Sequence, residues 1–254
     1  MNCGSHLHAL PSAGKKGVGK LIAIIGGGVL ALGAAVVVVI FVAKAMGRSN
    51  AKEKRIKCVN NLSEIGKATL GFSQDNGYHT PWNLIPSQRS RHFGTADKGM
   101  PSAGEIFGLS AMKSELQTAK FLVSPCDAAR MADNEMLQAK WANIDTKYYN
   151  NARGGNPVTD GTSYIFCQGG DFQRPATIVS LTRNLSGNSV VQANWAGADE
   201  TRISGNAMTG LNKSQGQLVA ADGSAKQSTD ADLGNLGKIV KGHINARGGT
   251  SRLG

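Results

Sequence analysis

The side chains that can bind a metal or react are few in this chain of 254 residues. Its cysteines are irregularly spaced and form no C-x-x-C pair, which excludes zinc and thioredoxin-like motifs. Cys126 and Cys167 can form a disulfide if the domain that carries them is exported. The alternative is that both are buried free thiols, and both interpretations stay open at this point. The four cysteines are Cys3, Cys58, Cys126 and Cys167.

No set of histidine, serine and aspartate residues has the spacing of a catalytic or metal site. The sequence contains no G-x-S-x-G nucleophile elbow. Residues 169–171 (GGD) are not followed by G-K-[ST], so we interpret them as a turn and not as a phosphate loop. We therefore expect no metal centre, no cofactor and no enzymatic activity. The histidines, which lack ligand spacing, are His6, His8, His79, His92 and His243.

Two aspartates near the C-terminal end of the chain, Asp230 and Asp232, can present carboxylate oxygens to calcium. The order of residues around them (TDADLGN) does not match an EF-hand loop. We interpret the segment as a solvated acidic turn and keep calcium binding as the alternative.

An uncharged segment, LIAIIGGGVLALGAAVVVVIFVA, runs from Leu21 to Ala43. As a helix it would be roughly 34 Å long, about the thickness of the hydrocarbon core of a bilayer. It predicts a transmembrane or filament-core helix over residues 21–45. Residues 1–20 have no apolar period and predict a basic, flexible N-terminal tail.

Three interpretations of this N-terminal part remain. A cleaved secretory signal would use the Ala-Lys-Ala site at residues 43–45, but the apolar segment is longer than a signal core. A signal anchor would keep the segment, and the larger number of cations after it favours a cytoplasmic C-terminal side. The third interpretation makes the segment the first half of one long helix, because no proline lies between Leu21 and Pro81.

The second half of that helix is expected over residues 46–76. An apolar stripe with helical spacing predicts that this half docks on the head domain. The stripe consists of Val59, Leu62, Ile65 and Phe72. The helix is expected to end near residues 75–77 (DNG), since Asn and Gly are helix-ending residues.

A line of small residues occurs every four positions within the apolar half. Small side chains on one helix face allow another helix to approach closely. The interpretation is a helix–helix packing face, and the alternative is a loosely apolar anchor without one. The residues are Ala23, Gly27, Ala31 and Ala35.

Residues 77–254 predict a loop-rich globular head with an antiparallel sheet, so the expected fold class is α+β. Residues 77–103 are expected to be a surface loop, and short helices are expected over 104–118 and 134–142. Asp222-Gly223 predicts a two-residue hairpin turn. Strands are expected at residues 121–123, 163–167, 177–181, 189–193 and 217–221.

The formal net charge of +11 is concentrated near the N-terminus. Residues 1–57 hold nine Lys and Arg against one Glu, a balance of +8, and the rest of the chain is close to neutral at +3. Cations that flank an apolar segment lie where lipid head groups do. A nucleic-acid-binding face would need basic and aromatic residues on the head, and aromatics make up 6% of the chain. We expect no nucleic-acid partner.

Several segments in chain order resemble one known family. Residues 54–66 (KRIKCVNNLSEIG) are similar to its "C-x-NNL-x-x-IG" helix, and residues 114–127 (SELQTAKFLVSPCD) to its "EL-x-TPK-x-L-x-CPSD" segment. The family is that of bacterial type IV pilins and type II secretion pseudopilins, and the resemblance covers roughly residues 52–236. Shorter likenesses are found at residues 75–77 (DNG), 81–82 (PW), 163–164 (SY), 183–185 (RNL) and 221–224 (ADGS).

The chain departs from that family at its processing motif. Family members have a leader that ends in Gly, then Phe, with Glu at the fifth mature position. Here Gly19 is followed by Lys20, and residues 21–43 contain no Glu. The motif that prepilin peptidase would read is therefore degenerate.

The resemblance implies a long helix, apolar then amphipathic, packed on an antiparallel sheet. It implies a structural subunit of a pilus-like or pseudopilus-like filament, with copies of itself or related pilin-like subunits and the membrane as partners. The location would be the bacterial inner membrane with an exported head, or a filament at the cell surface. The alternative is a membrane-anchored binding module, periplasmic or on the surface, that does not polymerise.

Overall fold

The computed structural model describes residues 16–97, 99–128, 141, 162–198 and 207–253, with the backbone alone for residues 16–38 and 41. The chain forms two compact units, Met1–Asn50 and Ala51–Gly254. The fold is α+β, with a long N-terminal helix and a four-stranded antiparallel sheet.

The long helix, α1, comprises Lys16–Asp75. It begins within the expected N-terminal tail and includes the whole apolar segment from Leu21 to Ala43. Within the part of the chain whose side chains the structure describes, no helix is long and apolar enough to span a membrane. Most of the apolar segment lies outside that part, so the transmembrane helix stays a prediction.

The C-terminal end of α1 lies where Asn and Gly predicted it, which confirms that boundary. Gly77 has a φ of +67°, in the left-handed region that glycine adopts without a steric cost. The N–H of Tyr78 donates to the Ser73 carbonyl at 2.7 Å, and the Asn76 side-chain amide donates to the Phe72 carbonyl at 2.8 Å. These bonds satisfy carbonyls that the helix end leaves unpaired.

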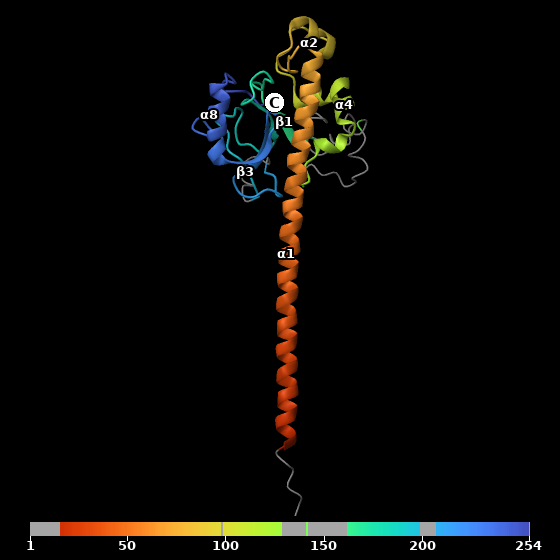
Figure 1. Ribbon diagram of the computed structural model, residues 1–254, viewed down its shortest axis with the longest axis vertical. Coiled ribbons are helices and arrows are strands. Elements are labelled where there is room, and N and C mark those ends of the chain that lie inside the picture. Colours follow the sequence, from red (N-terminus) through yellow and green to blue (C-terminus); the bar gives the residue numbers. More distant parts are fainter. Residues whose placement is uncertain (1–15, 98, 129–140, 142–161, 199–206, 254) are drawn as a thin grey trace, which may run out of the picture. The chain divides into compact units, whose positions relative to one another are not determined.

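The sheet contains β1 (Tyr164–Phe166), β2 (Ile178–Thr182), β3 (Gln215–Ala220) and β4 (Ala225–Thr229) in that order. All neighbouring strands are antiparallel. In Figure 1 the sheet lies between α8 and the part of α1 that belongs to the second unit.

The β3–β4 hairpin has a longer turn than the two residues expected from Asp222-Gly223. The N–H of Ala220 donates to the Ser224 carbonyl at 3.1 Å, which leaves three residues in the loop. Gly223 adopts a φ of +82°, as three-residue hairpin loops require near their end. The Asp222 carboxylate accepts the N–H of Ser224 at 2.8 Å and closes the turn.

Two expected strands are wrong. Residues 121–123 contribute to a 3-10 helix, η1 (Ala119–Leu122), because a three-residue apolar run has no period that distinguishes strand from helix. Residues 189–193 form a turn, in which the Gln192 N–H donates to the Ser189 carbonyl at 3.1 Å. Only an isolated bridge joins Ser189 to Arg252.

Short helices complete the second unit. Those expected over residues 104–118 are present, whereas α2 occurs within the expected loop 77–103 and α8 was not expected. The helix expected over residues 134–142 lies, except for Trp141, outside the described residues. The helices are α2 (Pro86–Phe93), α3 (Ala103–Gly108), α4 (Ser110–Leu116), η2 (Asp230–Asp232) and α8 (Lys238–Asn245).

Two hydrophobic clusters form the core of the second unit. Neighbouring β3 residues Leu218 and Val219 belong to different clusters, so the sheet is buried on both faces. The first cluster joins α1 to α3, α4 and the sheet, and α1 approaches so closely that a Cβ on Gly66 would lie 3.0 Å from Val219 Cγ2. The second cluster contains Trp195, and Val240 of α8.

Candidate functional site

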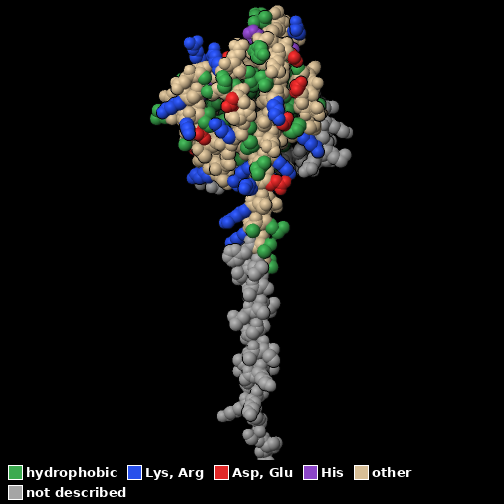
Figure 2. All heavy atoms as spheres, viewed as in Figure 1, with side chains coloured by type: hydrophobic (Ala, Val, Ile, Leu, Met, Phe, Trp, Pro, Cys, Tyr) green, Lys and Arg blue, Asp and Glu red, His purple; other side chains and the backbone are tan. Residues whose placement is uncertain are grey.

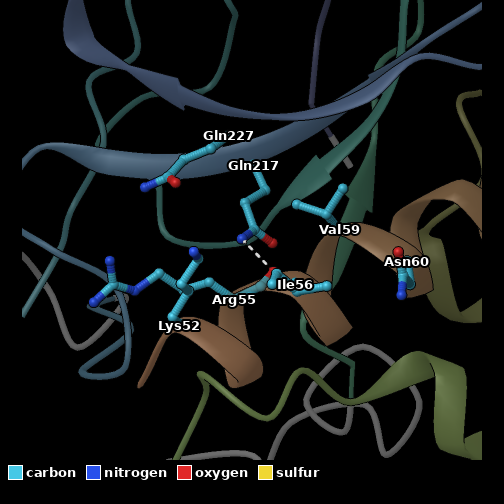
Figure 3. Close-up of a pocket in the computed structure, with 7 residues that line it drawn as sticks. All are labelled: Lys52, Arg55, Ile56, Val59, Asn60, Gln217 and Gln227. Carbon is cyan, nitrogen blue, oxygen red and sulfur yellow. Dashed lines mark hydrogen bonds between the residues drawn. The ribbon is translucent and has the colours of Figure 1, made fainter. Parts of the chain in front are cut away.

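A pocket of about 240 Å³ lies within the second unit, between α1 and the β3–β4 hairpin. Gln217 of β3 and Gln227 of β4 line one side of it, opposite cationic and apolar residues of α1 (Figure 3). The residues from α1 are Lys52, Arg55, Ile56, Val59 and Asn60.

Two shielded polar atoms at this pocket have no hydrogen-bond partner in the described part of the chain. Gln217 is fully buried, and its amide nitrogen donates to the Arg55 carbonyl at 3.0 Å, but its Oε1 accepts nothing. The Arg55 Nε likewise has no acceptor. Since buried polar groups are nearly always paired, one acceptor and one donor remain available here to a ligand.

The pocket is positively charged. Glu53 pairs with Lys57 at 2.7 Å, and the hydrogen bond and charge of Lys57 lower the pKa of the Glu53 carboxyl. No described acidic residue pairs with Lys52 or Arg55. On the face of the second unit seen in Figure 2, Lys and Arg outnumber Asp and Glu. An arginine and a lysine beside an apolar wall of Ile56 and Val59 can hold an oxyanion that carries an apolar group.

The first core cluster contains a group of buried thiols and hydroxyls, which neighbouring serines extend. The Ser124 hydroxyl donates to the Cys58 sulfur at 2.9 Å and accepts the N–H of Cys126 at 3.1 Å. The Tyr164 hydroxyl also donates to Cys58, at 3.4 Å. The Cys58 and Cys126 thiols are near enough to shift each other's pKa. The Ser163 hydroxyl accepts the N–H of Ser124 at 2.9 Å and holds the group in place.

These contacts perturb both thiols. Burial raises the pKa of Cys58 well above its ordinary value. The hydrogen bond from Cys58 lowers the pKa of Cys126, and Ser124 and the charges of Arg55 and Lys54 act in the same direction.

The two cysteines considered for a disulfide do not contact each other. Cys126 and Cys167 are both free and buried. Cys126 belongs to the first core cluster and Cys167 to the second. Burial raises the pKa of Cys167 to about 12, so this thiol is inert. The spacing of the cysteines in the sequence does not predict that Cys126 lies near Cys58.

The calcium candidates Asp230 and Asp232 use their carboxylates locally. Asp230 accepts the N–H of Trp195 at 2.6 Å, and Asp232 accepts that of Thr229 at 3.0 Å. No cluster of metal-ligating side chains occurs among the described residues.

The residues of the predicted stripe differ in burial. Leu62, Ile65 and Phe72 are fully buried in the first cluster, whereas Val59 is half-buried and lines the pocket. The small-residue line belongs to α1, but its side chains lie outside the described part of the structure. Its residues are Ala23, Gly27, Ala31 and Ala35.

Segments on which the family resemblance rests meet in the second unit. Asp127 and Arg183 form a buried ion pair, and the Asn61 amide donates to the Val123 carbonyl at 3.3 Å. No family model, curated protein or solved structure matches this chain.

Proposed function

We propose that this protein is a structural subunit of a pilus-like or pseudopilus-like extracellular filament, assembled through its N-terminal apolar helix. The observation that supports this most directly is the exposure of four large apolar side chains on α1 within the first unit. They are Val39, Ile40, Val42 and Met46, with 66%, 47%, 51% and 63% of their surface exposed.

Such a helix gains free energy when its side chains leave water, at about 25 cal/mol per Å² of apolar surface. A bilayer can cover them before assembly, and equivalent helices of other copies can cover them in a filament core. The proposed two-part helix has an apolar half for this purpose and an amphipathic half that docks on the head. The burial of Leu62, Ile65 and Phe72 supports the docking of the second half.

The test compares two double variants of the full-length protein by sedimentation. Val39→Asp with Val42→Asp should abolish assembly, because helices packed in a filament core cannot bury unpaired charges without a large cost in free energy. Ser49→Asp with Asn50→Asp adds the same charge at exposed positions of the same helix and should assemble like the natural protein. Equal assembly of both variants would overturn the proposal.

The pocket favours a second candidate function, a membrane-anchored module that binds an anionic ligand without polymerising. The unpaired Arg55 Nε, a charged donor, supports it. The test is equilibrium dialysis with inorganic phosphate and with a short-chain phosphate monoester. Lys52→Met with Arg55→Met should weaken binding at least tenfold, whereas Lys67→Met, which removes a surface pair with Glu64, should not. Binding that is equal in both variants would place the anion elsewhere.

A further inference from the structure

Cys58 and Cys126 lie 68 positions apart in the sequence, yet both sulfurs belong to one buried group. Ser124 contacts both residues, through its hydroxyl to the Cys58 sulfur at 2.9 Å and from the Cys126 N–H at 3.1 Å. Each thiol also shifts the pKa of the other, in keeping with this short link through Ser124. Their residues are 0% and 1% exposed, so nothing from solvent separates them.

The surrounding backbone holds both residues in place. The N–H of Gly210 donates to the Cys126 carbonyl at 2.9 Å, and a Cβ at Gly210 would lie only 2.6 Å from the Cys126 Cα. Cys58 is fixed by its position on α1, where Leu62 one turn further on is fully buried. The approach of the two thiols is therefore a product of the packed fold and not of free side-chain movement.

We propose that Cys58 and Cys126 are a disulfide site, which when oxidised ties α1 covalently to the segment that follows η1. The proposal goes beyond the assembly of filaments, since a bond between helix and head would carry mechanical load in any role. It is distinct from the Cys126–Cys167 pairing, because Cys167 belongs to the other face of the sheet.

The oxidant is a low-molecular-weight disulfide or the active disulfide of a thiol–disulfide oxidoreductase. One of the two cysteines attacks a sulfur of that disulfide as its thiolate, forms a mixed disulfide and releases the first thiol. The other cysteine then loses its proton and attacks the protein sulfur of the mixed disulfide, which releases the second thiol. Two protein thiols become one S–S bond, and the oxidant gains two electrons and two protons. Because both sulfurs are buried in the folded head, this exchange takes place while the head folds.

The test is refolding of the full-length protein in oxidised and reduced glutathione, followed by denaturation, alkylation and peptide mapping. The expected product is a linked pair of peptides that contain Cys58 and Cys126, with Cys167 alkylated. The variant Cys167→Ser should give the same linked pair, and Cys58→Ser and Cys126→Ser should give none. The map of the natural protein decides the question even if a variant fails to fold.

A linked Cys126–Cys167 pair, or alkylation of both Cys58 and Cys126 after oxidative refolding, would overturn the proposal. Unfolding with and without dithiothreitol gives an independent measurement. The reductant should lower the unfolding midpoint of the oxidised natural protein and leave that of Cys58→Ser unchanged. Equal effects of the reductant on both proteins would also contradict the disulfide.

Discussion

Arg183 and Asp127 form a bidentate ion pair in the interior of the second unit. The Arg183 Nε and Nη2 donate to the two carboxylate oxygens at 2.6 and 2.7 Å, and the two side chains are 7% and 0% exposed. Arg183 is the first residue after β2, and Asp127 is the first residue after Cys126. The pair therefore joins the end of β2 to the segment that carries Cys126.

Removal of one partner of this pair should destabilise the head strongly. Asp127→Asn leaves the guanidinium buried without a counter-charge, which costs roughly 3–5 kcal/mol in known buried pairs. Urea denaturation monitored by circular dichroism measures the loss. Asp127→Leu with Arg183→Met should recover part of it, because no charge remains buried. If Asp127→Asn alone were as stable as the natural protein, the ion pair would not form in solution.

The docking stripe of α1 gives a second prediction. Leu62→Asp or Ile65→Asp should prevent the head from folding, because each would bury an unpaired carboxylate among fully buried side chains at a cost of several kcal/mol. Asn60→Asp introduces the same charge at an exposed position of the same helix and should fold normally. Thermal unfolding separates the outcomes. A cooperative, unshifted transition in Leu62→Asp would mean that this stripe is not the core face.

His243 of α8 makes the stability of the head depend on pH. Its Nδ1 accepts the N–H of Ile178 at 3.0 Å, so Nε2 carries the proton of the neutral ring and donates to the Ser251 hydroxyl at 2.6 Å. Burial lowers the pKa of His243 below its ordinary value of about 6.5. The unfolded chain then binds a proton at a higher pH than the folded chain.

The contribution of His243 to the free energy of unfolding should therefore be fully present above about pH 6.5. It should fall as the pH decreases toward the lowered pKa. His243→Ala should be less stable at pH 8 by about 1–3 kcal/mol, since it leaves the Ile178 N–H unpaired, and its slope between pH 4 and pH 7 should be shallower. His92, whose pKa burial also lowers, is present in both proteins and contributes equally. Identical slopes would assign the pH dependence to other groups.

The helical part of the fold was largely predictable where the apolar period is long. The stripe from Val59 to Phe72 and the Asn-Gly end of α1 are local signals that depend on neighbouring residues alone. Short helices were less predictable. α8 contains Gly242, which has a low helix propensity. Hydrogen bonds of its buried His243 with Ile178 and Ser251 stabilise the helix instead.

The candidate site was not predictable from spacing. The sequence offers three partners for Cys126, and only the packing of α1 against the residues after η1 selects Cys58. The pocket likewise depends on Gln217 and Gln227, which come from two strands and lie more than 150 positions from Arg55. Such non-local contacts are consequences of topology, which a single sequence does not reveal.

Filament formation by the full-length protein is the most direct test of the proposed function. Lipid gives helices no hydrophobic reason to associate, so close packing would depend on the small side chains on α1. Negative-stain electron microscopy of the natural protein after detergent removal should show filaments. Gly27→Leu with Ala31→Leu should abolish them without unfolding the head, and Val29→Leu with Val36→Leu should leave them intact. Absence of filaments from the natural protein, or equal filament amounts from both variants, would contradict assembly through this helix face.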